Sequence, residues 1–230
     1  AVTLERVAQD GMRVRASAGE SSFRRKATLE ACLKEAREQV RRLAEGREQP
    51  DSGLTKRQAA ARQRAAAERV ERVEKALAYM PELEATQEVQ RKRPANAERG
   101  KVTEARASTT DPEARVMRMA DGGYRPAYNA QLATDGASGV IVGVAITTSG
   151  SDAHEAPDME EQIERRTGGR PKTYLMDAGF AARDAITVLE ERGVSVYAPV
   201  RLPKRKPEAE RYGPRYGDSR QVRVWRERMA

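Results

Sequence analysis

The segment PKTYLMDAGFAARDAITVLEERGVSVYAPV, residues 171–200, decides the fold. An apolar run at 173–176 leads directly into Asp177. A helical pattern with apolar residues at 182, 186, 188 and 189 follows, and after Gly193 a second apolar run spans 194–200. This order predicts a strand, a helix and a strand, and such a crossover joins parallel strands of one buried sheet. Functional groups of these sheets lie at the carboxyl ends of the strands, where Asp177 lies.

The composition of the 230-residue chain limits what surrounds this unit. Hydrophobic residues make up 38%, charged residues 34% and aromatic residues only 4%, so the chain has a core but also long solvated parts. The net charge of +8 and a pI near 9.8 favour a polyanionic partner. Residues 201–230 hold ten basic and four acidic residues and so carry +6 of this charge. We expect DNA to contact this basic tail, with Lys204, Arg205 and Lys206 as binding residues.

Other features of the sequence exclude several classes of protein. Cys32 is the only cysteine, which excludes an intrachain disulfide and favours a small buried side chain on a helical face. The longest apolar run, 140–146, is far too short to cross a bilayer, and no secretory signal is visible. We therefore expect a soluble cytoplasmic protein. Because the sequence begins at Ala1 and stops at Ala230 within a charged pattern, we also expect a fragment of a longer chain.

The first twenty residues predict β structure around Asp10. Asp10-Gly11 is a strong turn signal, whereas residues 12–16 alternate with a period of two. Either a hairpin or one strand that carries Asp10 agrees with this pattern. On local sequence alone, a turn residue is the simpler interpretation of Asp10.

Two helical patterns follow, and both space their apolar residues alternately by four and three. The seams are residues 29, 33, 36, 40 and 43, and residues 66, 70, 73, 77 and 80. Matching seams with a short connection predict an antiparallel helical hairpin, whose second helix Pro81 interrupts or restarts. The other faces are densely charged. A DNA-contacting or dimerising arm and a solvated insertion both agree with this, and the alternatives stay open.

The rest of the chain predicts a return to a sheet. Residues 93–123 are small and polar and predict a linker, whereas 124–134 and 139–148 predict a β-hairpin with a loop at 135–138. Residues 155–166 predict an amphipathic helix that Gly168 ends, with Asp152 or Ser151 as its N-cap. The predicted fold class is α/β. The predicted domains are a first-strand region at 1–20, a helical insertion at 21–101, the remaining α/β domain at 102–200 and the basic tail at 201–230.

Asp10 and Asp177 are the candidate site residues, since both lie at predicted strand positions of one domain. Paired carboxylates from different strands suit Mg²⁺ or Mn²⁺, although two carboxylates among 35 acidic residues are weak evidence by themselves. Other residues favour structural interpretations. These are His154 in a loop before a helix, Trp225 as an anchor of the tail rather than a base-stacking ring, and Glu190 and Glu191 as solvent-facing side chains.

Several blocks of this sequence resemble bacterial insertion-sequence transposases of the DDE type, in the IS4/IS5-like superfamily. The blocks are DGMRVRASAGESSFRR at 10–25, DPEARVMRMADGGYRPAYNAQLATD at 111–135, SDAHEAP at 151–157, and YLMDAGFAARDAITVLEERGVSVYAPV at 174–200. They run through nearly the whole chain in the family's order. The resemblance is specific as a set.

This resemblance implies an RNase H-like catalytic domain, with a mixed sheet and flanking helices, interrupted by the helical-hairpin insertion. It implies Asp10 and Asp177 as the first and second catalytic and metal-binding carboxylates. In the family such acids hold two divalent cations, Mg²⁺ or Mn²⁺, for attack on a DNA phosphodiester. Phe180 stands where the family more commonly has Tyr. The implied partners are transposon-end and target DNA, with a homodimer as an open alternative.

The family's third acid is a Glu on a helix that follows a block resembling VWRERM at 224–229. The resemblance therefore implies that this Glu lies beyond residue 230 and that Glu227 does not replace it. It also implies that the family's N-terminal DNA-binding region precedes this sequence. Two functions agree with the sequence. One is a partial transposase catalytic domain, and the other is a non-catalytic DNA-binding or oligomerising remnant.

Overall fold

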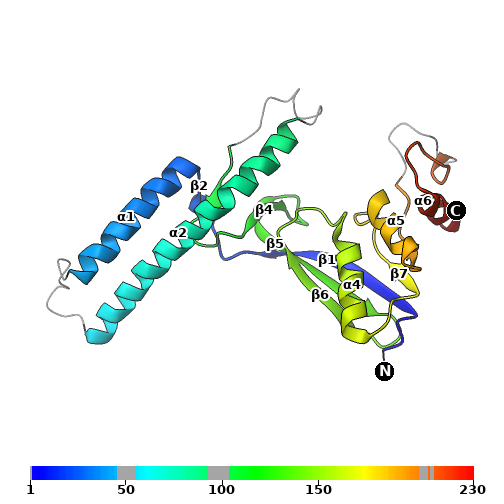
Figure 1. The fold of residues 1–230 in the computed structure, drawn as a ribbon, viewed down its shortest axis with the longest axis horizontal. Coiled ribbons are helices and arrows are strands. Elements are labelled where there is room, and N and C mark those ends of the chain that lie inside the picture. The colour runs from blue at the N-terminus through cyan, green and yellow to red at the C-terminus, as the bar shows by residue number, and fades with distance from the viewer. Residues whose placement is uncertain (1, 46–54, 93–103, 202–206, 208–209) are drawn as a thin grey trace. The chain divides into compact units, whose positions relative to one another are not determined.

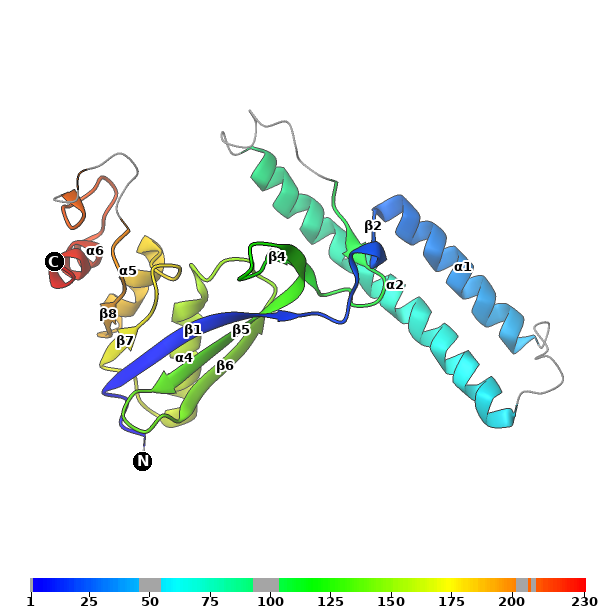
Figure 2. The same ribbon diagram turned by 180° about the vertical axis from the view of Figure 1, so that it is seen from behind.

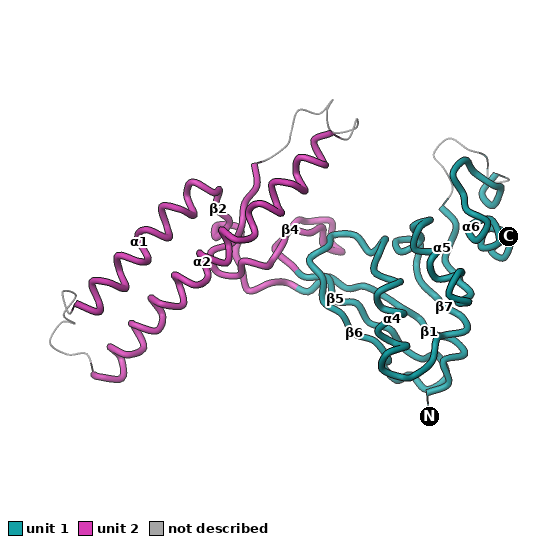
Figure 3. Tube along the Cα trace, viewed as in Figure 1, with its two compact units in different colours: residues 1–14, 128–230 teal, residues 15–127 magenta. Residues whose placement is uncertain are grey.

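The computed structural model describes residues 2–45, 55–92, 104–201, 207 and 210–230 (Figure 1). The chain forms two compact units (Figure 3). Unit 1 contains residues 1–14 and 128–230, and unit 2 contains residues 15–127. The first strand of the chain therefore belongs to the same unit as the last hundred residues.

A mixed sheet forms the centre of unit 1. Its strands are β1 (Arg6–Arg15), β5 (Tyr124–Asp135), β6 (Ile141–Thr147), β7 (Thr173–Leu175) and β8 (Ser195–Tyr197). β1 lies between β5 and β7, β8 follows β7, and β6 pairs with β5. The β1–β7 and β7–β8 pairs are parallel, whereas β5 and β6 form the antiparallel hairpin that the sequence predicts. Asp10-Gly11 does not turn the chain, and β1 is one continuous strand.

Three helices of unit 1 cover this sheet: α4 (Glu155–Thr167), α5 (Arg183–Glu191) and α6 (Arg220–Arg228). Figure 2 shows α4 behind β1, β5 and β6. α5 connects β7 to β8, so the predicted strand–helix–strand crossover is confirmed. α4 ends at Gly168, which has the left-handed φ of 77° that glycine favours at a helix end. α6 lies in the segment that the sequence suggested only as a basic tail.

The core of unit 1 lies between the sheet and these helices. Tyr174 of β7 and Phe180 of the following loop are almost fully buried there, with Ile186 and Leu189 of α5. Trp225 of α6 is 2% exposed and packs into the same core, which confirms it as an anchor of the C-terminal segment. Burial of these large apolar side chains is the main force that holds the crossover and α6 on the sheet.

The helical hairpin of unit 2 has its own small core. α1 (Lys26–Ala44) and α2 (Lys56–Arg91) lie side by side in antiparallel directions (Figures 1 and 2). The predicted seams meet, because Leu29 of α1 packs with Val73, Ala76 and Met80 of α2. Cys32 packs at the edge of this cluster and is only partly buried. α2 begins with a capping box, in which the Thr55 hydroxyl accepts a hydrogen bond from the backbone N–H of Gln58.

Two predictions for unit 2 are wrong. The helix α2 passes through Pro81 without a break, because the buried seam on both sides of the exposed proline outweighs the loss of one backbone hydrogen bond. The second error is the linker: within 93–123, residues 93–103 lie outside the described ranges, but β3 (Ala107–Ser108) and β4 (Arg115–Arg118) are strands. β3 pairs with β2 (Phe23–Arg24), and β4 pairs with residues 124–127 of β5. Buried Ala107 and Met117 give these short strands a packing face.

The predicted fold class is confirmed. The chain has a mixed sheet of order β4-β5-β1-β7-β8 with flanking helices, and a helical hairpin follows β1 before the sheet resumes. This architecture is compatible with an RNase H-like fold. Among the described residues, no helix combines the length and the apolar character that a membrane crossing requires.

Candidate functional site

Asp10 lies within β1, and Asp177 lies in the loop that follows the neighbouring parallel strand β7. The β1–β7 ladder pairs Arg6 with Thr173 and ends with Ala8 beside Leu175. Asp10 and Asp177 each follow the last pair of this ladder by two residues, Asp10 within β1 and Asp177 beyond the end of β7. The parallel pairing thus brings together the two segments that lead to these acids, although most of the chain separates them.

Both carboxylates are exposed, and each is oriented by the backbone that follows it. Oδ1 of Asp10 accepts a hydrogen bond from the N–H of Gly11 at 2.8 Å, and Oδ1 of Asp177 accepts one from the N–H of Gly179 at 2.5 Å. A Cβ atom on Gly179 would lie 2.7 Å from Oδ1 of Asp177, so a side chain at this position would displace the carboxylate from this orientation. Within the described ranges, Oδ2 of each acid accepts no hydrogen bond. Each side chain therefore keeps an oxygen available to a ligand.

The donor set agrees in part with a hard divalent cation. Mg²⁺ and Mn²⁺ prefer carboxylate oxygens, and Asp10 of β1 and Asp177 of the loop after β7 are two such groups. Across the residues that the structure describes, no group of three His, Cys, Asp or Glu side chains is placed to hold an ion.

A polar network lies on the opposite face of β1 from Asp10. Oδ1 of Asp152 accepts hydrogen bonds from Asn129 and Gln131 of β5, each at 2.8 Å. Nη2 of Arg13 donates to Oδ2 of Asp152 at 3.1 Å. Gln131 also accepts from Gln9 of β1 at 2.9 Å. These bonds tie β1 to β5 and to the loop before α4.

The network continues to β7 through a buried tyrosine. The Tyr174 hydroxyl donates to Oε1 of Gln9 at 2.7 Å, and burial, with the nearby charge of Glu160, raises the pKa of Tyr174 so that it remains a neutral donor. Burial acts to raise the pKa of Asp152, but hydrogen bonds from Arg13 and Asn129 outweigh it and hold that pKa below its usual value. The network therefore links β1, which carries Asp10, to β7, which precedes the loop with Asp177.

The role of Asp152 as the acceptor of this network was not predicted from the sequence. Asp152 and Ser151 were the expected N-caps of α4, but the N-cap is His154, without a side-chain cap bond. One signal was present, because the period-two pattern of β5 sets Asn129 and Gln131 on one face with Ala133. Buried amides need partners. The sequence does not show which carboxylate accepts hydrogen bonds from these amides, because the contact joins residues more than 20 positions apart.

The remaining sequence candidates have other surroundings. His154 is exposed and lies 3.2 Å from a carboxylate oxygen of Asp184. Glu190 was expected to face solvent, and this is wrong: its side chain is 10% exposed and forms an ion pair with Arg228 of α6. Glu191 and Glu227 are exposed. The predicted DNA-binding residues Lys204, Arg205 and Lys206 lie outside the described residues.

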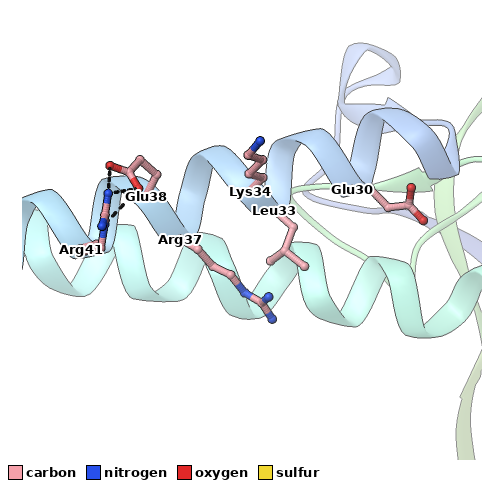
Figure 4. Close-up of a pocket in the computed structure, with 6 residues that line it drawn as sticks. All are labelled: Glu30, Leu33, Lys34, Arg37, Glu38 and Arg41. Carbon is pink, nitrogen blue, oxygen red and sulfur yellow. Dashed lines mark hydrogen bonds and ion pairs between the residues drawn. The ribbon is translucent and has the colours of Figure 1, made fainter.

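A hollow of about 400 Å³ along α1 offers no second site. It is lined by Glu30, Leu33, Lys34, Arg37, Glu38 and Arg41 (Figure 4). All six residues belong to one helix, and its charges are mixed. Arg41 bonds to Glu38, and Arg37 bonds to Glu74 of α2. This pattern is typical of a solvated helix face.

Comparisons with known proteins place the chain in a family. A family model described as "Transposase DDE domain" matches residues 101–229, which is more than half of the chain. Asp177 lies inside the matched range, and Asp10 lies before it. A search of curated proteins finds no match. The chain belongs to the transposase DDE domain family.

Proposed function

We propose that this chain carries out metal-dependent phosphoryl transfer on DNA during transposition, with Asp10 and Asp177 as its metal ligands. The observation that carries the proposal is the parallel β1–β7 pairing, which ends at Ala8 and Leu175, two residues before Asp10 and Asp177. The family match supports the same chemistry. Assignment to the IS4/IS5-like superfamily rests on the sequence blocks, and a homodimer stays a prediction.

The two acids have the same task in this mechanism. Asp10 presents a carboxylate oxygen from β1 and Asp177 presents one from the loop after β7, and the N–H groups of Gly11 and Gly179 hold the other oxygen of each in place. A bound Mg²⁺ or Mn²⁺ would supply positive charge to the phosphoryl group and activate a water or a DNA hydroxyl. The net charge of +8 favours association with DNA.

The test is metal binding and DNA nicking by the 230-residue chain and by Asp10→Asn and Asp177→Asn. We expect each substitution to weaken Mn²⁺ binding, measured by electron paramagnetic resonance, by about tenfold or more. Any Mg²⁺-dependent nicking of DNA should be lost as well. Asp158→Asn, which changes an exposed acid of α4, is the matched control and should leave both measurements unchanged.

Two results would contradict the assignment. Wild-type Mn²⁺ affinity in both Asp variants would show that these acids are not ligands. Salt-sensitive DNA binding with no metal binding and no nicking by the wild-type chain would instead favour the non-catalytic DNA-binding form.

A further inference from the structure

Unit 1 contains a cavity of about 400 Å³ in which arginine side chains converge. Its polar and aromatic lining consists of Arg183, Arg201, Arg215, Arg226, Tyr216 and Trp225. We call this cavity the arginine pocket. The residues come from α5, α6 and the segment between β8 and α6, which the crossover and the Trp225 anchor hold together.

Positive charge in this pocket exceeds the negative charge that the described residues bring to it. Asp218 is the carboxylate in contact with the cluster: it bonds to Nε of Arg226 at 2.8 Å and lies 3.7 Å from Nη1 of Arg183. The side chain of Asp218 is fully buried. The Asp218 carboxylate thus contacts the guanidinium groups of two of the four arginines that line the pocket. Burial lowers the pKa of Arg215, and repulsion from the charges of Arg226 and Arg183 adds to this effect.

Arg226, which lines the pocket, has a buried donor without a partner. The residue is 3% exposed, its Nε and Nη2 bond to Asp218, and its Nη1 has no hydrogen-bond partner within the described part of the chain. A buried charged donor without a partner is costly, and such groups are rare in folded proteins. The unused N–H groups of a guanidinium match the oxygens of a phosphate in geometry and charge.

The rim of the pocket adds a feature that suits a DNA strand. Tyr216 is fully exposed, and an exposed aromatic ring beside a cationic site is suited to stacking on a base. Ala181, which also lines the pocket, is followed by the start of α5 at Arg183, where no side chain caps the helix. In this first turn the N–H of Ala185 donates to the Asp184 carboxylate, so the helix start adds no free anion site and the arginines supply the positive charge. Ala181 is four residues from Asp177 in the same loop.

We propose that the arginine pocket binds a backbone phosphate of DNA and that Tyr216 stacks on a neighbouring base. This inference rests on the proposed function for the identity of its ligand. The arginine pocket would contact DNA from the folded part of unit 1, and it is separate from the basic residues at 204–206. Gly217 supports the pocket, because its φ of 80° and the 3.0 Å from its Cβ position to Nη1 of Arg183 both require glycine.

The experiment measures binding of the full 230-residue chain to a short fluorescent DNA by anisotropy, in EDTA, between about 50 and 200 mM salt. Arg183→Gln and Arg201→Gln change exposed members of the pocket, and Arg223→Gln changes an exposed arginine of α6 that does not line it. We expect the first two to weaken binding by about tenfold and to reduce the slope of log affinity against log salt by about 1. Arg223→Gln should match the wild type.

A second variant separates stacking from charge. Tyr216→Ala should weaken binding by about tenfold without changing the salt slope, since stacking releases no counterion. The proposal is overturned if the two pocket arginine variants and Tyr216→Ala bind DNA as Arg223→Gln does. A thermal shift with inorganic phosphate that depends on Arg183, together with unchanged DNA affinity, would assign the pocket to a free anion and would also overturn it.

This measurement is independent of the metal site. Asp10→Asn and Asp177→Asn should bind DNA in EDTA at least as tightly as the wild type. Failure of the metal-binding test would therefore leave the pocket result intact, and unchanged DNA affinity in the pocket variants would leave the Asp10–Asp177 assignment intact.

Discussion

Gly11 lies where side chains of two other elements converge on β1. A Cβ atom at this position would lie 2.5 Å from Nε2 of Gln131 and 2.7 Å from Oδ1 of Asp152. Both atoms belong to the buried polar network, and neither can move without losing hydrogen bonds. The absence of a side chain here allows β1 to approach the network one residue after Asp10.

We therefore expect Gly11→Ala to lower the free energy of unfolding by about 1–3 kcal/mol. Gly150→Ala is the control, because nothing lies within 4 Å of the added Cβ and the backbone there is not left-handed. Urea unfolding followed by circular dichroism measures both variants. Equal stability of Gly11→Ala and Gly150→Ala would show that the polar network rearranges at little cost in free energy and does not constrain β1.

Asp135 connects the beginning of the chain to the β5–β6 turn. Its carboxylate accepts hydrogen bonds from the hydroxyl and N–H of Ser138 and from the N–H of Leu4. The Ser138 hydroxyl is the main cause that lowers the pKa of Asp135 to about 2; burial opposes the shift. The bond to Leu4 also supports a positive φ of 55°, which is uncommon for leucine.

This lowered pKa predicts a pH dependence of stability. An unfolded aspartate titrates near pH 3.9, so Asp135 contributes stability above about pH 4 that is lost as the pH falls toward 2. Asp135→Asn should be less stable at neutral pH and should lose less stability between about pH 4 and pH 2. Urea unfolding over this range checks it. The same acid-induced loss in the variant as in the wild type would contradict the prediction.

At the scale of elements, the helical hairpin of unit 2 depends on a narrow seam. Met80 is 1% exposed and packs with Leu29 and Val73, whereas Val89, nine residues further along α2, is 59% exposed. The remaining faces carry exposed ion pairs such as Arg37–Glu74 and Lys75–Glu71, which contribute little each. The few buried apolar contacts must therefore supply most of the stability of the pair.

Met80→Ala should accordingly destabilise α1 and α2 by about 2–5 kcal/mol, since it leaves a cavity in a small core. Val89→Ala on the same helix should stay within about 0.5 kcal/mol of the wild type. Hydrogen exchange of the α1 and α2 amides reports on these helices directly. Protection in Met80→Ala equal to that in Val89→Ala would show that the seam is not what holds the hairpin.

At the scale of the whole molecule, positive charge is used in two different ways. In unit 1 it gathers in the arginine pocket, which four arginines line and where the Asp218 carboxylate contacts two of them. On the helices of unit 2 it alternates with acidic residues in pairs such as Arg41–Glu38 and Arg91–Glu88. The excess of +6 in residues 201–230 indicated the first of these, but the pocket also depends on Arg183 of α5.

Local patterns in the sequence were sufficient for most of the elements. The apolar runs on either side of Asp177 predicted the crossover, and the alternating spacing of four and three predicted the α1–α2 pair, because these periodicities record which face of an element is buried. The patterns failed for β4 and for the passage of α2 through Pro81. In both places, packing against distant residues outweighed local composition.

The sequence by itself determined the fold class, through periodicity, and the family, through its ordered blocks. Only the tertiary structure decided that Asp10 lies within a continuous strand parallel to β7, that Asp152 serves β1 rather than capping α4, and that Glu190 pairs with Arg228. Arg13 and Asp152 are 139 positions apart. Such contacts depend on strand register and on how helices pack against the sheet, and neither is encoded in the residues adjacent to the site.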